Sequence, residues 1–186
     1  FTVVDNDGIL DMTVDKYRDP SDVSGLPNMW DNAAIDVSFW FANDGWSQIA
    51  NPEYEAEGKA HTIVVPEGTG ASTWQGQMVF NHTGLVLSPE KKYTFKVTFL
   101  SDEDHPHVVI KPCYQHPTEK DGNGNPADVN ELFFKDNLTL TADEECVFTA
   151  AGVQGADIPD LKLVFDFGGA VAGSIITIKD ITLVEL

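Results

Sequence analysis

Short runs in which apolar and polar residues alternate constrain the fold of this chain more than any other feature. The clearest run, residues 93–99, reads Tyr-Thr-Phe-Lys-Val-Thr-Phe. Alternation with a period of two is typical of a β-strand that buries one of its faces. Similar runs occupy residues 61–65, 107–110, 138–141, 161–167 and 175–185, and none of the chain shows a convincing long helical pattern. The sequence therefore predicts an all-β protein.

Turn sequences rich in glycine, proline and asparagine separate these runs, at residues 66–70, 88–91, 121–126 and 168–169. Many short strands joined in this way favour a two-sheet antiparallel β-sandwich of the jelly-roll type. A chain of 186 residues without a linker or an internal repeat is expected to form a single domain, 1–186. Residues 1–35 fit this pattern least and are expected to be an atypical N-terminal extension, in which 28–34 could form one helical turn.

The charge of the chain excludes one class of partner. Thirty acidic residues against eleven basic ones give a formal net charge of −19, which repels nucleic acid. No run of about 18 apolar residues is present, so no membrane span is expected. The first residues lack the basic start and apolar stretch of a signal peptide, as in a mature or excised fragment or a cytosolic protein. Neutral sugars remain possible ligands.

The two cysteines, Cys113 and Cys146, lie in different strand-like segments. They could form a disulfide if those strands are neighbours, or they could be two buried thiols that pack as small apolar side chains. The sequence leaves both alternatives open.

A tryptophan with small polar neighbours is the leading candidate for ligand binding. The apolar face of a pyranose ring packs on a flat side chain, while its hydroxyls need amide, carboxylate or hydroxyl partners. Trp74 lies among serine, threonine, glutamine and glycine, with Gln77 three residues further on. We expect Trp74 to be exposed and to stack on a sugar, whereas Trp30, Trp40 and Trp46 are expected to pack in the core or at an edge.

A second aromatic platform is expected from one of two segments. One carries Tyr114 and His116, and the other carries Phe133, Phe134 and Asn137. Alternation from the strand expected at 138–141 turns Phe134 inward and Phe133 and Asn137 outward, and a bulge would reverse this assignment.

Clusters of carboxylates at 53–57, 102–104 and 143–145 raise the alternative of a glycoside hydrolase, whose chemistry needs two carboxyl groups. No distinctive motif surrounds any of them, so we expect solvated surface. The segment 121–125 has oxygen-bearing side chains at alternate positions, but Pro126 and Leu132 stand where a calcium-binding EF-hand needs glycine and glutamate. It is expected to form a turn.

From about residue 54 onward the order of motifs resembles the carbohydrate-binding modules of the family 4, 9 and 22 group, jelly rolls attached to bacterial xylanases and cellulases. The matching pieces are a "G-x-x-x-x-x-V" strand at 58–65, Trp74 with Gln77, an "L-x-x-G-x-x-Y-x-F-x-V" strand pair at 87–97, the segment 163–169, and an "I-x-I-D-x-V-x-L" closing strand at 176–183. The chain departs from the group in lacking the "N-G-x-F-E" opening and in having Glu90 and Lys91 in place of the usual glycine before the tyrosine strand.

The resemblance implies a non-catalytic module that binds xylan or a related β-linked plant polysaccharide in an open cleft on the concave face of one sheet. Trp74 would stack on a sugar and Gln77 would bind its hydroxyls, with Tyr114, His116, Phe133, Phe134 and Asn137 as the remaining candidates and the loop between residues 116 and 130 bordering the cleft. One structural calcium ion is implied, with Asp180 matching one of its ligands.

The resemblance also implies a monomer, outside the cell or on a bacterial cell surface, that targets an appended glycoside hydrolase to its substrate. Two alternatives stay open: a small jelly-roll hydrolase or lyase, and a structural or adhesion β-sandwich without a sugar site, in which Trp74 would be buried.

Overall fold

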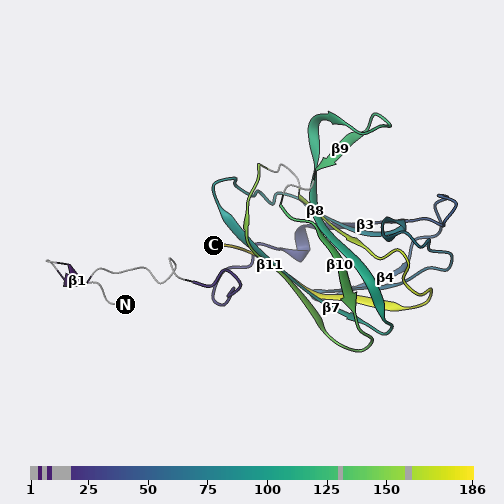
Figure 1. Ribbon diagram of the computed structural model, residues 1–186, viewed down its shortest axis with the longest axis horizontal. Coiled ribbons are helices and arrows are strands. Elements are labelled where there is room, and N and C mark those ends of the chain that lie inside the picture. The colour runs from purple at the N-terminus through teal and green to yellow at the C-terminus, as the bar shows by residue number, and fades with distance from the viewer. Residues whose placement is uncertain (1–3, 6–7, 10–17, 130–131, 158–160) are drawn as a thin grey trace.

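Two antiparallel sheets pack face to face in the computed structural model, which describes residues 4–5, 8–9, 18–129, 132–157 and 161–186 (Figure 1). The first sheet has the strand order β10 (Lys135–Leu140), β8 (His105–Lys120), β12 (Leu161–Asp166), β6 (Gly76–His82) and β3 (Ile35–Phe41), with β9 (Pro126–Val129) paired to β8 off this path. The second has the order β11 (Cys146–Gln154), β7 (Lys92–Ser101), β13 (Ile175–Glu185), β5 (Ala60–Val64) and β4 (Glu53–Glu57). The predicted antiparallel β-sandwich is confirmed.

The remaining elements are short. Two 3-10 helices, η2 (Asn32–Ala34) and η3 (Thr73–Gln75), precede β3 and β6, and β1 (Val4–Asp5) pairs with β2 (Gly8–Ile9) in a separate ladder. None of the helices in the described part of the chain has the length and apolar character needed to cross a membrane. The six alternating runs in the sequence coincide with β5, β7, β8, β10, β12 and β13, which confirms those strand predictions.

Alternate residues of each central strand build the core between the sheets. On β6, Met78 and Phe80 are buried, while the alternate residues Gln77 and Val79 are half-exposed on the outer side. The ring of Phe165 on β12 contacts Phe80 edge-to-face at 5.6 Å, and it contacts Phe99 of the opposite sheet at the same centroid distance. Edge-to-face contacts add about 0.5–1.5 kcal/mol to the free energy gained by burying each ring.

The segment before β3 is hydrogen-bonded to the sandwich at several points, beginning with the Pro20 carbonyl, which accepts from the Thr94 hydroxyl at 2.6 Å. The Asn28 side chain accepts a hydrogen bond from the Leu183 N–H at 2.9 Å, and the Met29 N–H donates to the Leu183 carbonyl at 2.7 Å. Trp30 is buried in the core, as predicted. The helical turn expected at 28–34 is present over three residues, with the Asp31 carboxylate accepting from the Ala33 N–H at its start.

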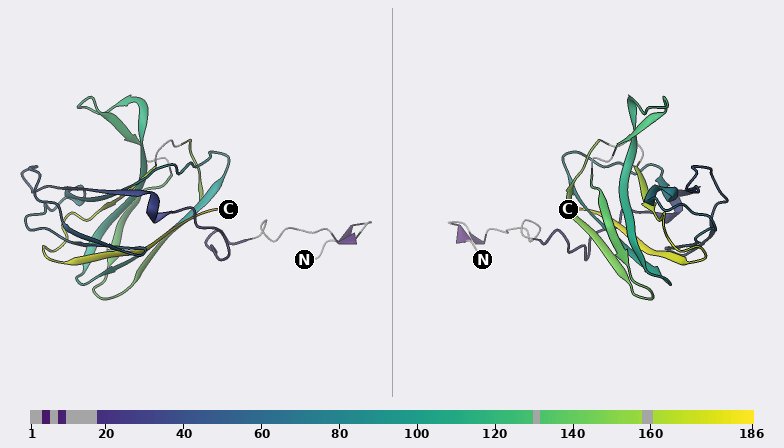
Figure 2. Two further views of the ribbon diagram at one scale, coloured as in Figure 1. Left: turned by 180° about the vertical axis from the view of Figure 1, so that it is seen from behind. Right: turned by 45° about the vertical axis from the view of Figure 1, so that its right-hand side comes forward.

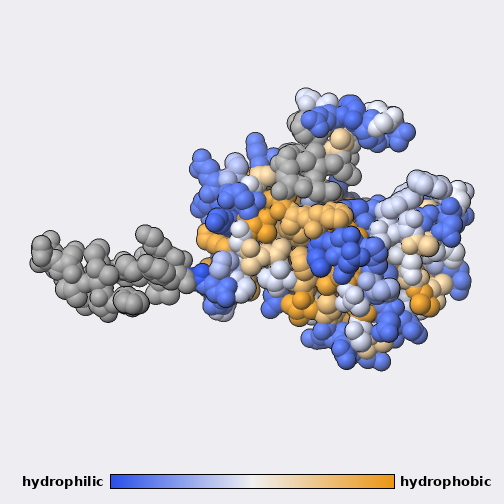
Figure 3. Space-filling view, viewed as in Figure 1, coloured by the Kyte–Doolittle hydropathy of each residue, from blue (hydrophilic) through white to orange (hydrophobic). Residues whose placement is uncertain are grey.

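The segment expected to be a long loop between residues 116 and 130 is a hairpin. Strand β8 continues to Lys120, and β9 returns along it, so the hairpin projects from the body of the sandwich (Figures 1 and 2). The turn prediction at 121–125 is confirmed: the Asp121 carboxylate accepts from the N–H groups of Asn123 and Asn125 at 2.9 and 2.8 Å. These two bonds lower the pKa of Asp121. In Figure 3 the tip of this hairpin is hydrophilic, whereas apolar residues gather on the sandwich beneath it.

The two cysteines are not joined by a disulfide, and their strands belong to different sheets. Cys113 lies on β8 and Cys146 on β11, and neither belongs to a disulfide. Cys113 is buried and Cys146 is half-buried, so the alternative of two packed thiols describes Cys113 best. Partial burial raises the pKa of the Cys146 thiol.

Candidate functional site

A row of side chains crosses the outer face of the six-stranded sheet at right angles to its strands. Pairing places Trp40 of β3 opposite Gln77 of β6, Gln77 opposite Asp166 of β12, and Asp166 opposite Val109 of β8. Directly paired residues point to the same side of a sheet. Four neighbouring strands extend over about 14 Å in this direction, so the row is long enough for a chain of several small rings.

Three indole rings meet at the β3 end of this row. The Trp74 ring stacks on Trp40 with centroids 5.5 Å apart and planes inclined by 26°. It also contacts Trp46 at 4.5 Å with a tilt of 45°. Trp40 and Trp74 are half-buried, whereas Trp46 is 71% exposed. We call Trp40, Trp46 and Trp74 the indole cluster.

Local hydrogen bonds hold Trp74 in place on η3. The Gln75 side-chain oxygen accepts from the Ser72 N–H at 2.9 Å, and its amide nitrogen donates to the Asn43 carbonyl at 2.6 Å. Gly168 lies directly beneath, since a Cβ atom on it would come within 1.8 Å of the Ser72 carbonyl oxygen. Only glycine allows this approach of two backbone segments. The residues around Trp74 therefore fix its position from two sides.

Trp46 occupies a tight turn between β3 and β4. Its N–H donates to the Asn43 carbonyl at 2.9 Å, and the Asn43 side-chain oxygen accepts from the Ser47 N–H at 3.0 Å. The backbone of Trp46 has φ +67°, in the left-handed region that bulky side chains rarely adopt. A non-glycine residue pays about 1–2 kcal/mol for this conformation. The prediction that Trp46 packs in the core or at an edge is wrong, whereas Trp40 does lie on an edge strand.

Next to the indole cluster, a buried carboxylate links three strands. Asp166 is 2% exposed, yet it lies outside the core. Its Oδ1 accepts from Gln77 Nε2 at 2.8 Å, and its Oδ2 accepts from Lys111 Nζ at 2.7 Å. A buried charge needs such a partner to offset the loss of hydration. Beyond these bonds, the Gln77 amide has an acceptor oxygen and the Lys111 ammonium has further N–H donors, which suit ligand hydroxyls.

The structure reverses the orientation predicted for the two phenylalanines. The Phe133 ring packs inward between Phe95 and Phe148, at 5.3 and 5.6 Å, while Phe134 is 57% exposed. The reason is a register shift in the β10–β8 pairing between residues 135 and 138, where Asn137 takes a positive φ of 54°. Such a bulge moves side chains to the opposite face. It leaves Phe134, not Phe133, as an exposed aromatic ring.

The other predicted residues of the second platform have separate positions. Asn137 is exposed, and its amide donates to the Asp136 carboxylate at 3.1 Å. Tyr114 and His116 belong to β8, but their side chains lie outside the described residues. The structure adds an exposed pair at this end of the sheet: His107 Nε2 lies 2.6 Å from Asp136 Oδ1, and this hydrogen bond lowers the pKa of Asp136.

The surroundings of Asp180 do not match the needs of calcium. Its Oδ1 lies 3.3 Å from the Lys59 ammonium, and its Oδ2 accepts from the Thr182 hydroxyl at 3.2 Å. Calcium takes six to eight oxygen ligands. Within the described part of the chain, no three histidine, cysteine, aspartate or glutamate side chains are grouped as a metal site. The structural calcium ion therefore stays a prediction, without support from the residues described around Asp180.

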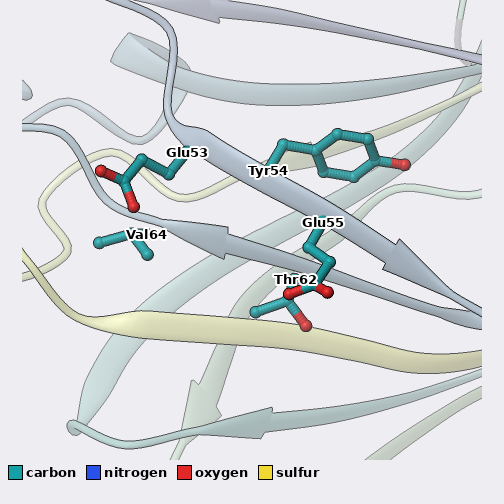
Figure 4. Close-up of a pocket in the computed structure, with 5 residues that line it drawn as sticks. All are labelled: Glu53, Tyr54, Glu55, Thr62 and Val64. Carbon is teal, nitrogen blue, oxygen red and sulfur yellow. The ribbon is translucent and has the colours of Figure 1, made fainter.

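An acidic hollow lies on the opposite sheet, over β4 and β5. Its volume is about 340 Å³, and Figure 4 shows Glu53 and Glu55 extending on the side of Thr62 and Val64, while Tyr54 points away. Every residue of β4 is exposed, which confirms the prediction that the carboxylates at 53–57 form solvated surface. The Tyr54 hydroxyl instead bonds to His61 at 2.8 Å. The lining of the hollow thus combines two carboxylates with one aromatic residue, Tyr54, whose ring is turned away from them.

Comparison with known proteins supports the fold more than the family. Neither a scan against protein-family models nor a search of curated proteins finds a match. Among solved structures, a module described as CBM4 has a TM-score of 0.53 and 20% identity, covering 89% of this chain and 92% of its own. The N-terminal cellulose-binding domain of β-1,4-glucanase C from Cellulomonas fimi has a TM-score of 0.47 and 15% identity, covering 82% and 89%.

The chain thus has the fold of a family 4 carbohydrate-binding module, which confirms at the level of architecture the resemblance seen in the sequence. Assignment to family 4, 9 or 22 stays a prediction. The site residues that sequence reasoning missed are Trp40, Trp46, Lys111 and Asp166. Of these, only Trp46 carried a local signal, because it follows an Asn-Asp-Gly turn.

Proposed function

We propose that this protein is a non-catalytic carbohydrate-binding module whose site is the outer face of the six-stranded sheet. The observation that carries the proposal is the indole cluster beside the Gln77–Asp166–Lys111 network. Flat rings and fixed polar groups, side by side, match the apolar faces and hydroxyl rims of a polysaccharide. The fold shared with a family 4 module supports the same class of function.

The proposed ligand is xylan or a related β-linked plant polysaccharide, bound along the row that crosses the strands. Stacking should contribute about 1–2 kcal/mol for each ring, which implies micromolar to millimolar dissociation constants for a site with two platforms. Such affinity suits a module that keeps an appended glycoside hydrolase near its substrate by raising the local concentration. We place the protein outside the cell or on a bacterial cell surface.

The first test is binding of the wild type to xylan, mixed-linkage glucan and mannan oligosaccharides, measured by isothermal titration calorimetry. Replacement of Trp74 by alanine should weaken binding at least tenfold, because it removes the ring that contacts both other indoles. Val147→Ala is the matched control, since Val147 is an exposed apolar side chain on β11 of the other sheet. Unchanged affinity of the Trp74 variant would remove the indole cluster from the site.

The same samples test the enzymatic alternative. Release of reducing sugar from any of the three glycans by the purified protein would contradict the non-catalytic proposal. Failure of the wild type to bind any of them would favour a structural or adhesion domain.

A further inference from the structure

We infer that Trp46, on the turn at residues 43–48, is the indole that contacts the ligand directly, and that Trp74 is the positioning residue behind it. The inference rests on the proposed function and assigns a role within that same site. It moves the direct contact away from the tryptophan that the sequence singles out. Four observations carry it: ring contacts, exposure, backbone conformation and anchoring of the turn.

The contacts of Trp74 occupy much of its ring. Trp40 stacks on it at 5.5 Å and Trp46 leans on it at 4.5 Å, and the side chain as a whole is only half-exposed. A ring that already packs on two indoles has little free surface for a pyranose. Trp46 differs from Trp74 in this respect. Its ring contacts Trp74, and the residue is still 71% exposed. Its free surface is the large flat area that a sugar ring needs.

The backbone at Trp46 shows that the turn is not optimised for folding. With φ +67°, the position suits glycine or asparagine, and a bulky side chain there is strained. Because most of the indole is exposed, its burial offsets little of this strain energy. Strained conformations of this kind are concentrated at functional sites, where the geometry they impose is needed. At this position, the geometry brings the indole against Trp74.

The turn is also fixed at several points, which a ligand platform requires. The Ser47 N–H and the Trp46 N–H both bond to Asn43, and the Asn43 carbonyl accepts from Gln75 Nε2 as well. The Asp44 carboxylate accepts from the Ala71 N–H at 2.8 Å, which ties the turn to the segment before η3. A platform held in advance loses less conformational entropy when the ligand binds.

The test uses substitutions that relieve the strain while removing the ring. Trp46→Gly and Trp46→Asn both accept a positive φ, so their melting temperatures should equal or exceed that of the wild type. Their affinity for the glycan that the wild type binds best should fall about tenfold. Trp46→Tyr, which keeps a flat ring, should recover most of the binding, and Val147→Ala should change neither quantity.

Two results would overturn the assignment. Either glycan affinity within twofold of the wild type for both Trp46→Gly and Trp46→Asn, or a clear fall in their melting temperatures, would show that the ring serves packing and not binding. Trp74→Ala separates the two roles, because it should lower both affinity and melting temperature. A wild type that binds none of the three glycans overturns the proposed function itself, and this assignment with it.

Discussion

The two outer faces of the sandwich are built from different kinds of side chain. On the five-stranded sheet, Thr62 and Thr177 lie opposite each other with their hydroxyls 3.0 Å apart, and threonine and valine recur across the face. On the six-stranded sheet, the corresponding surface holds indole rings and the buried Asp166 carboxylate. Both surfaces belong to strands of one sandwich, so the fold alone does not demand the second composition.

The difference separates residues that stabilise the fold from residues that contribute little to its stability. β-Branched side chains on a pleated surface stabilise pairs of strands at little cost. A buried ion pair instead gains little over apolar side chains of the same size, and a tryptophan with positive φ stores strain. Features that do not help folding gather on the six-stranded sheet, and this asymmetry supports the proposal that its outer face binds the ligand.

The largest expected effect is a loss of stability in acid. We expect a histidine of the six-stranded sheet to contribute more to this loss than a histidine of the five-stranded sheet. Burial, with a smaller contribution from nearby His107, lowers the pKa of His105 on β8 to about 4, from an ordinary value of 6.5. The unfolded state therefore binds a proton first as the pH falls. The free energy of unfolding should drop by about 3 kcal/mol between pH 6.5 and pH 4 and then level off.

Urea unfolding at a series of pH values measures this loss. His105→Phe should remove most of the acid-dependent slope. His61→Phe on β5 should remove less, because burial lowers the pKa of His61 less strongly. Equal slopes for the wild type and the His105 variant would contradict the prediction.

The next effect concerns the buried carboxylate. Asp166→Ala leaves the Lys111 ammonium and the Gln77 amide without their partner, and Lys111 is only 19% exposed. We expect a loss of about 2 kcal/mol in the free energy of unfolding, from urea denaturation at pH 7. The matched control breaks an exposed pair on the other sheet: Lys59→Met should cost under about 1 kcal/mol. Similar losses in both variants would erase the contrast between the faces.

The smallest expected effect compares two polar truncations. Gln77→Ala should weaken glycan binding by about 1 kcal/mol, or roughly fivefold, through the loss of hydrogen bonds to ligand hydroxyls. Thr62→Ala on the opposite face should leave the dissociation constant unchanged, because its hydroxyl bonds to Thr177. Calorimetric titration with the best-bound oligosaccharide measures both. Weaker binding by the Thr62 variant would indicate that the ligand binds the five-stranded sheet, which would contradict the proposed site.

The β-sandwich was predictable because the alternation of apolar and polar residues is visible within each strand's own sequence. Strands β7 and β13 were predictable from their own residues, and so was the turn at 121–125. The orientation of Phe133 and Phe134 was not, because it depends on a register shift between β10 and β8. A one-residue slip reverses the faces and leaves no trace in the pattern of the segment.

The site was predictable only in part, for the same reason. Trp74 and Gln77 stood out through their neighbours in the sequence. Asp166 ends a mostly apolar strand, while its partners Lys111 and Gln77 are 55 and 89 positions away in the sequence. Only strand pairing brings them together. Trp46 follows an Asn-Asp-Gly turn, but tryptophans usually pack, and its exposure and its φ of +67° become evident only in the structure.

The indole cluster gives the protein an internal optical probe. Three rings with centroids 4.5 and 5.5 Å apart are close enough for their electronic transitions to couple, and the resulting circular dichroism depends on their mutual orientation. A glycan that shifts one ring changes this signal without any added label. The proposed glycan binding can therefore be tested spectroscopically in the unmodified protein.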